Sequence, residues 1–246
     1  MARRRGARRW FVRLAGALAL AGFAALLVVQ VWFLAQVLWL AHNNPASTAF
    51  MDARLETLRA QTALQGKDPD RTVHLAYRWV PYDRISQHLK RAVVAAEDAR
   101  FLDHAGLDWD AIERAIEKNQ KRGRVVEGAS TITQQLAKNL FLSGERAWTR
   151  KAQEAIIAWM LEATLSKRRI LELYLNVAEW GEGVFGAQAA ARTHFGTSAA
   201  ALSPGQAAWL AAVLPSPRRY AHGRTTPYLE RRVEVILARM RSARIP

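Results

Sequence analysis

Residues 127–139 have the sequence EGASTITQQLAKN, in which a glycine and a run of hydroxyl side chains lead into a helical pattern. Thr131 and Gln134 have the spacing of a capping box, the side-chain arrangement that satisfies the first free N–H groups of a helix. Because those N–H groups and the helix dipole also attract anions, capping or phosphate binding would each explain Ser130 and Thr131. The polar face that follows is suited to a sugar or a phosphate and is less easily explained by capping: Gln134, Gln135, Lys138 and Asn139.

Outward from this stretch, the chain has helical character from Pro81 almost to its end. Alanine-rich and leucine-rich runs repeat with a period near 3.6 and are separated by Gly, Ser and Asp signals. Glu172 and Asn176 are polar groups on an otherwise apolar helix, and we expect them to bind backbone. Residues 73–80 alternate and are predicted to be the only strand-like piece. The sequence therefore predicts a mainly α fold, with helix starts at Asp108, Thr131, Ser203 and Thr226.

Two adjacent carboxylates lie upstream, in the stretch AEDARFLDHAGL at 96–107. Glu97 and Asp98 are neighbours on a helix and project to different sides, so they cannot both lie in the core. An acid that follows the apolar run 93–96 can occupy a partly dry cleft with a raised pKa, which suits a general base near neutral pH. The alternative is a solvated helix end, which residue type alone favours.

A cationic cluster lies downstream of residues 127–139. Arg146 precedes the stretch RKAQE at 150–154, in which Arg150 and Glu154 are spaced to face each other on a helix. Such a pair is commonly a surface ion pair worth roughly a few tenths of a kcal/mol. The functional alternative is a cationic wall for a diphosphate, with Glu154 holding the cations in place.

Several classes of site are excluded because the chain lacks the residues or motifs that they require. It contains no cysteine, which excludes a disulfide framework, a zinc ribbon, an iron–sulfur cluster and a thiol nucleophile. It has no P-loop and no H-E-x-x-H motif. Nor does it carry the S-x-x-K or K-T-G motif of a penicillin-reactive serine, so we expect no transpeptidase activity.

The formal charge of +15, from 36 Lys and Arg against 21 Asp and Glu, indicates a polyanionic partner such as nucleic acid, an anionic membrane or a phosphorylated substrate. Six of these net charges belong to residues 1–13, because no acid precedes Asp52. The stretch 14–41 that follows is uncharged. As a helix rising about 1.5 Å per residue it would extend roughly 42 Å, which exceeds a hydrocarbon core of about 30 Å.

These features predict four parts: a basic cytoplasmic N-terminus at 1–13, a transmembrane helix at 14–41, a linker and membrane-proximal helix at 42–72, and a catalytic domain at 73–246. A cleaved signal peptide is the alternative to a membrane anchor. The apolar region of a signal peptide is usually about 7–15 residues long and ends in small residues. Here bulky side chains occupy the far end, which favours an uncleaved anchor: Leu38, Trp39 and Leu40.

Taken in order, these clusters resemble the family 51 glycosyltransferases, the peptidoglycan polymerase module of bifunctional penicillin-binding proteins. Residues 97–106 match the pattern E-D-x-x-F-x-x-H-x-G, and 128–139 match G-x-S-T-I-T-Q-Q-x-x-K-N. Residues 150–154 match R-K-x-x-E, and 170–176 match a helix ending in Y-L-N. The resemblance covers roughly residues 91–220 and implies a lysozyme-like helical domain. The chain looks like a monofunctional transglycosylase of a Gram-negative bacterium, which implies an inner-membrane protein with a periplasmic catalytic domain.

Two departures from the family pattern lie outside the expected chemistry. The stretch THFGT at 193–197 replaces the commoner Tyr-Phe-Gly-Lys, and Gln206 stands where Glu is frequent. They bear on specificity rather than on activity.

The family joins lipid II units into β-1,4 glycan strands with inversion, as the 4-hydroxyl of one unit attacks the growing chain and undecaprenyl diphosphate leaves. By this resemblance Glu97 is the general base, Asp98 supports it, and Glu154 is a second carboxylate that positions the cations and the donor. The cations expected to neutralise the diphosphate are Lys138, Arg146, Arg150 and Lys151. The residues expected to bind sugar and phosphate oxygens are Ser130, Thr131, Gln134, Gln135 and Asn139.

The expected partners are lipid II, the growing lipid-linked glycan, the membrane, and cell-wall or division-complex proteins, but no nucleic acid. No cofactor is required by the sequence, and a divalent Mg or Mn ion at the diphosphate stays open. Because the substrate is lipid-anchored, apolar residues beside the cations are expected to dip into the bilayer: Leu140, Phe141, Leu142 and Trp148.

Two other functions compete with this hypothesis. A lysozyme-like hydrolase or lytic transglycosylase would use one carboxylic acid on the same polymer, but it needs no cationic diphosphate pocket. A membrane-tethered nucleic-acid-binding or scaffold protein would explain the basic charge, although the chain shows no nucleic-acid recognition module.

Overall fold

The computed structural model describes residues 2–68, 70, 73–124, 128–142, 148–220 and 226–246. It divides into two compact units, Met1–His42 and Asn43–Pro246. The first unit is the helix α1 (Ala2–Leu40). Its segment Arg13–Leu40, with a mean hydropathy of 2.3, is long and apolar enough to cross a membrane. The chain therefore carries one candidate transmembrane helix within the described residues.

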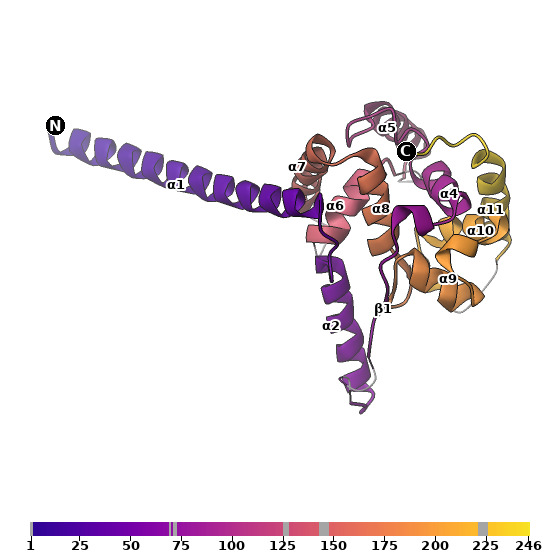
Figure 1. Cartoon of the computed structure of the whole chain (residues 1–246). Helices are drawn as coiled ribbons and strands as arrows, with labels where there is room; N and C mark the ends of the chain where they lie inside the picture. Colours follow the sequence, from indigo (N-terminus) through magenta and orange to yellow (C-terminus); the bar gives the residue numbers. More distant parts are fainter. Residues whose placement is uncertain (1, 69, 71–72, 125–127, 143–147, 221–225) are drawn as a thin grey trace. The chain divides into compact units, whose positions relative to one another are not determined.

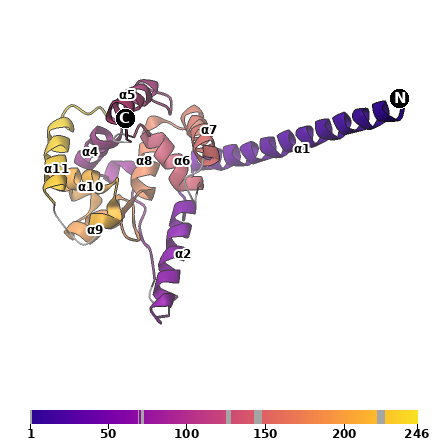
Figure 2. The ribbon, with the colours of Figure 1, turned by 180° about the vertical axis from the view of Figure 1, so that it is seen from behind.

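The second unit is mainly α-helical, as Figure 1 and the reverse view in Figure 2 show. Its helices are α2 (Ala49–Leu64), α4 (Gln87–Glu97), α5 (Trp109–Arg122), α6 (Ile132–Phe141), α7 (Trp148–Thr164), α8 (Lys167–Val177), α9 (Ala187–Phe195), α10 (Pro204–Val213) and α11 (Pro227–Arg239). Three short 3-10 turns lie at Tyr82–Arg84, Ala199–Ala201 and Pro217–Tyr220. The prediction of a mainly α fold is confirmed.

A small sheet interrupts the helices. It has the strand order β1-β3-β2, in which β1 (Ala76–Tyr77) is parallel to β3 (Val184–Phe185) and β2 (Glu179–Gly181) is antiparallel to β3. The expectation that residues 73–80 form the only strand-like piece is therefore wrong. Strands of two or three residues carry too little alternation to be recognised from sequence, and their pairing depends on contacts distant in the chain.

The helix starts follow local side-chain chemistry. Asp108 accepts a hydrogen bond from the backbone N–H of Ala111 (2.9 Å), and Gly123 ends α5 in the left-handed conformation at φ +62°. Reciprocal capping boxes begin two other helices, at Thr131–Gln134 and Ser203–Gln206. All four predicted helix starts are confirmed, because caps act within one turn of the chain.

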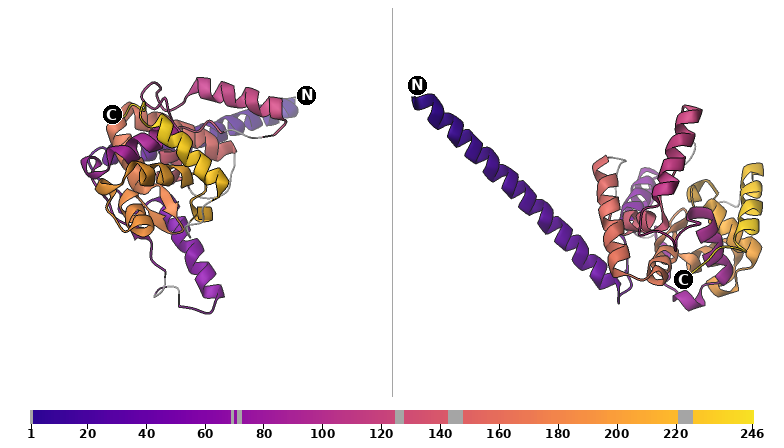
Figure 3. Two further views of the ribbon diagram at one scale, coloured as in Figure 1. Left: turned by 90° about the vertical axis from the view of Figure 1, so that its right-hand side faces the viewer. Right: turned by 90° about the horizontal axis from the view of Figure 1, so that it is seen from above.

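Two groups of helices surround the site described below. Helix α6 packs against α2, α7 and α8, and α10 packs against α4 and α11. Most of α8 is buried, with its apolar side chains at the centre of the unit. Helix α5 extends away from the other helices (Figure 3), and only Ala115 on it is buried. The region around α4, α6 and α8 is thus the most buried part of this unit.

Polar groups on the buried helix α8 hold the incoming chain. The side-chain Oδ1 of Asn176 accepts from the N–H of Val80 (2.8 Å) and its Nδ2 donates to the carbonyl of Val80 (2.9 Å). Glu172 Oε1 accepts from the N–H of Tyr82 (2.8 Å). A side chain at Gly186, where φ is +81°, would place its Cβ 2.6 Å from the carbonyl oxygen of Asn176. Backbone binding by Glu172 and Asn176 is therefore confirmed.

Candidate active site

Glu97 ends helix α4 and is largely buried, with 10% of its side chain exposed. The Nε2 of Gln135, on α6, donates to its Oε2 (2.9 Å). Tyr174, on α8, donates its hydroxyl to the Oε1 of Gln135 (2.9 Å), which fixes the amide so that its NH₂ group faces the carboxylate. The alternative of a solvated helix end is therefore wrong, because three helices converge on this carboxylate.

Burial is the largest influence on the protonation of this group. It raises the pKa of Glu97 above its ordinary value, and the nearby charge of Asp98 adds to this effect. The hydrogen bond from Gln135 and the charges of Arg232 and Lys138 oppose it only in part. Full burial also raises the pKa of the Tyr174 hydroxyl well above its ordinary value, so Tyr174 stays a donor. A carboxylate with a raised pKa can accept a proton near neutral pH.

Arg232, on α11, is a site residue that the sequence did not reveal. Its Nη2 lies 3.6 Å from the Oε1 of Glu97, the oxygen that Gln135 does not reach. This oxygen is buried and accepts no hydrogen bond from the described residues. The two residues are far apart in the chain, and α11 is rich in Arg, so no local pattern distinguishes Arg232.

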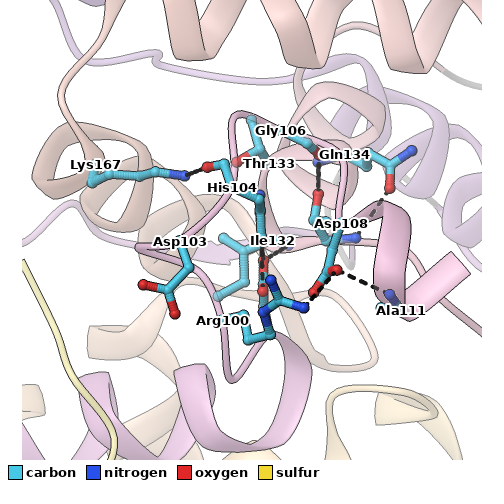
Figure 4. Close-up of polar contacts among 12 residues, drawn as sticks. Arg100, Asp103, His104, Gly106, Asp108, Ala111, Ile132, Thr133, Gln134 and Lys167 are labelled. Atoms are coloured by element: carbon cyan, nitrogen blue, oxygen red, sulfur yellow. Dashed lines mark hydrogen bonds and ion pairs between the residues drawn. The ribbon is translucent and has the colours of Figure 1, made fainter. Parts of the chain in front are cut away.

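Asp98 turns away from Glu97, as the sequence required. Its carboxylate contacts the Nε2 of His104 (2.9 and 3.1 Å) and accepts from the N–H of Ile132 at the start of α6 (3.0 Å). Figure 4 shows Lys167 pointing at this loop, where its Nζ donates to the carbonyl of His104 (2.6 Å). Asp98 therefore ties the end of α4 to the start of α6, which carries Gln135. Asp98 is thus in position to support Glu97 through the fold, and its charge adds to the raised pKa of Glu97.

Glu154, on α7, is a second buried carboxylate, with 4% of its side chain exposed. It forms an ion pair with Lys151 and lies 3.7 Å from the Nη1 of Arg150. Lys151 also donates to the hydroxyl of Ser130 (3.0 Å). Since a buried charge needs a partner, Glu154 fixes the position of two cations and is more than a surface ion-pair partner.

A cavity of about 530 Å³ brings these groups together. Glu97 and Glu154 both line it, and so do Lys138, Arg150 and Lys151; its remaining lining residues are Ser130, Gln135, Trp148, Leu214 and Pro215. A larger cavity of about 690 Å³ adjoins it and shares Gln135, Lys138, Arg150, Leu214 and Pro215; Asn139 lines this larger cavity. A base, a held carboxylate and three cations in one cavity can support transfer of a group from an anionic leaving group.

Some predicted site residues lie elsewhere. Thr131 and Gln134 are buried in the cap of α6, where each satisfies the other's backbone N–H, and Thr131 also donates to the carbonyl of Gly106 (2.6 Å). Neither lines the two cavities, and both act as caps of α6; that they also bind sugar or phosphate stays a prediction. Arg146 lies outside the described residues.

The described residues hold no group of three or more His, Cys, Asp or Glu side chains that could bind a metal ion. The positive charge that the structure places in the cavity is that of Lys138, Arg150 and Lys151.

Comparisons with known proteins agree with this geometry. A family model described as Transglycosylase matches residues 68–241. The chain is 53% identical to a protein of Nitrosospira multiformis over 97% of this chain and 99% of that protein. It is 55% identical to one of an Azoarcus species over 97% of each chain, and 52% identical to one of Bordetella pertussis over 96% of each. All three relatives carry the name biosynthetic peptidoglycan transglycosylase.

Proposed function

Because the chain belongs to the transglycosylase family, we propose that it is a peptidoglycan glycosyltransferase that polymerises lipid II into β-1,4 glycan strands and releases undecaprenyl diphosphate. One observation carries this proposal: the base Glu97 and three cations line the same cavity. A hydrolase acting on the finished polymer has no diphosphate to neutralise, so the cations favour the synthetic reaction.

Glu97 takes the proton from the 4-hydroxyl of the acceptor as that oxygen attacks the anomeric carbon of the donor. Gln135, itself held by Tyr174, orients the carboxylate through Oε2, and Arg232 faces the buried Oε1. Since burial raises the pKa of Glu97, the carboxylate binds the abstracted proton more strongly than an exposed one would.

The bond to the diphosphate breaks on the opposite side of the anomeric carbon, which inverts its configuration. Negative charge then develops on the diphosphate, and Lys138, Arg150 and Lys151 stabilise it. Glu154 holds Arg150 and Lys151 in place before the substrate arrives. Ser130 and Asn139 supply polar groups for sugar or phosphate oxygens at the two cavities.

We further propose that α1 is an uncleaved anchor in the inner membrane, with its arginine-rich start in the cytoplasm and the catalytic unit in the periplasm. Residues beside the cations are exposed and apolar on α7: Trp148 (91%), Ile156 (41%) and Trp159 (64%). They support contact with the bilayer. Leu140 is buried (6% exposed), so the expectation that it dips into the membrane is wrong.

The polymerase reaction is tested by incubating the purified full chain with lipid II and separating the products by size. We expect polymer from the wild type and at least a hundredfold loss for Glu97→Gln, because the amide cannot accept the proton. Glu234→Gln, an exposed carboxylate on α11, serves as the control and should polymerise normally. A wild type that makes no polymer, or an active Glu97→Gln, would contradict the proposal.

A further inference from the structure

Helix α2 precedes the segment that the family model matches, which begins at residue 68. It is nevertheless part of the catalytic unit and packs against α6, the helix that carries Gln135 and Lys138. The site thus includes an element that the family's motifs do not describe.

A buried ion pair fastens α2 to the sheet. Arg54 Nε lies 2.9 Å from Glu179 Oε1, and its Nη2 lies 3.1 Å from Oε2, so the pair is bidentate. Only 10% of the Arg54 side chain and 4% of the Glu179 side chain are exposed. Glu179 Oε1 also accepts from the N–H of Gly183 (3.3 Å). A bidentate pair of this kind fixes both distance and angle between two elements.

Aromatic and apolar contacts extend the attachment. The ring of Phe50 packs edge-on against Phe185 of β3, with their centroids 6.0 Å apart. Lys138 Nζ lies 5.7 Å from the centre of the same Phe50 ring. Helix α2 therefore touches one of the cations proposed to bind the diphosphate.

The chain that leads into α2 is also fixed to the catalytic unit. Tyr77 donates its hydroxyl to the carbonyl of Pro45 (2.8 Å). The Nη2 of Arg169 donates to the carbonyl of Asn43 (2.6 Å) and to Oδ1 of Asn44 (2.9 Å). The segment that leads into α2 is therefore held on the catalytic unit at Asn43, Asn44 and Pro45.

The larger cavity has α2 as one wall, through Phe50, Ala53, Arg54 and Thr57. Its other walls contribute the cations Lys138, Arg150, Arg218 and Arg219, whereas the carboxylate of Glu179 is already neutralised by Arg54. The cavity is therefore suited to an anionic, polar ligand. It shares Lys138 and Arg150 with the Glu97 cavity. A diphosphate bound by these two cations would therefore have its attached sugar in one of the two cavities.

We propose that α2 is a wall of the substrate cleft, and that its Phe50–Thr57 face contacts the saccharide-diphosphate of a lipid-linked substrate in the larger cavity. This inference rests on the proposed function, because that reaction requires two lipid-linked saccharides to meet at Glu97. The Arg54–Glu179 pair is the latch that holds the wall in place.

The wall is tested by filling the cavity from α2. Thr57→Trp and Ala53→Trp add bulk to lining positions, and Glu56→Trp adds the same bulk at an exposed position of α2 outside the lining. Binding of fluorescent lipid II is measured in detergent micelles on a Glu97→Gln background, in which we expect turnover to be at least a hundredfold slower. We expect at least tenfold weaker binding for both lining variants, unchanged binding for Glu56→Trp, and thermal unfolding within about 2 °C of the parent.

The latch is tested with Arg54→Glu, Glu179→Arg and the two combined. Each single change leaves two like charges facing each other, so we expect weaker lipid II binding and faster amide exchange in residues 49–64. The swapped pair should restore both, and Arg59→Glu, on an exposed face of α2, should alter neither. If the swapped pair restores neither lipid II binding nor slow amide exchange, the Arg54–Glu179 pair does not hold α2 in place.

The binding readout separates this inference from the polymerase reaction. If Thr57→Trp and Ala53→Trp weaken lipid II binding, the result supports α2 as a wall of the cleft. This holds even if the wild type makes no polymer and the proposed reaction fails. If both variants bind lipid II as tightly as the parent, α2 is not a wall of the substrate cleft, even if the wild type polymerises lipid II.

Discussion

At the scale of single residues, the state of Glu97 is set by a balance between burial and the groups around it. Arg232 opposes the effect of burial, so its removal should raise the pKa of Glu97 further. For Arg232→Ala we expect the acid limb of the pH profile of kcat/KM to move to higher pH, with a larger loss of polymerisation at pH 6 than at pH 8. Arg232→Lys, which keeps the charge, should move it less.

Arg231 is the matched control for this experiment, because it precedes Arg232 on α11 and is exposed. Arg231→Ala should give the wild-type profile. If Arg232→Ala lowers activity equally at every pH, the guanidinium does not act on Glu97 through its charge. A pure packing role would then also appear as reduced thermal stability.

We also expect Glu97 to lower the stability of the folded protein at neutral pH. Because its pKa in the folded protein is raised, the folded state holds a proton that the unfolded state has released, and stability falls as pH rises above the ordinary carboxyl range. Glu97→Gln removes the buried charge and can still accept from Gln135, so we expect its melting temperature at pH 7–8 to exceed that of the wild type by about 2–4 °C.

The pH dependence of the increase in melting temperature tests whether the buried charge is its cause. Below the unfolded-state pKa the carboxyl is protonated in both states, so the difference in melting temperature should vanish near pH 4. A gain that is equally large at pH 4 would show that packing, and not the charge, is responsible.

At the scale of elements, helix α7 carries cations on one side and an apolar stripe on another. Trp148 and Trp159 are eleven residues apart, so about three helical turns bring them to the same face. Interfacial aromatic residues bind the headgroup level of a bilayer. We expect Trp159→Glu to weaken sedimentation of residues 43–246 with anionic liposomes by roughly tenfold.

Trp109 on α5 is 70% exposed, which is similar to Trp159. The variant Trp109→Glu therefore distinguishes membrane binding by the apolar stripe of α7 from an effect of exposed apolar side chains in general. It should weaken liposome binding less than Trp159→Glu does. Equal losses for the two variants would contradict a stripe confined to α7.

The elements predicted correctly are those that local chemistry specifies. Caps such as Asp108 and the Thr131–Gln134 box act within one turn, so the sequence alone located these helix starts. The same chemistry leaves the site ambiguous in sequence, since hydroxyl and amide side chains serve capping and substrate binding alike. Thr131 and Gln134 form the buried cap of α6, and substrate binding by them stays a prediction.

What the sequence could not predict depends on distant pairings. Arg232 meets Glu97, and Arg54 meets Glu179, across more than a hundred residues each. The strands are too short to show a period, and their partners lie far along the chain. The candidate base and cations could be named from motifs, but the shape of the cleft could not.

At the scale of the whole molecule, the charge distribution makes a prediction about topology. Six arginines precede the apolar segment, so residues 1–13 should stay in the cytoplasm. The chain has no cysteine, which leaves no background for single-cysteine labelling. In spheroplasts we expect a membrane-impermeant maleimide to label Ala200→Cys, and to label Gly6→Cys only after permeabilisation. Labelling of both positions in intact spheroplasts would exclude a single span with this orientation.

The larger cavity takes one wall from a helix that the family segment does not contain. Codons for the chemistry and codons for this wall therefore occupy separate stretches of the gene. An inhibitor that contacted the 50–57 face would discriminate between this enzyme and a relative with identical catalytic motifs but a different N-terminal region. We expect resistance to such a compound to arise in residues 49–64, at sites that a survey restricted to the catalytic motifs would not sequence.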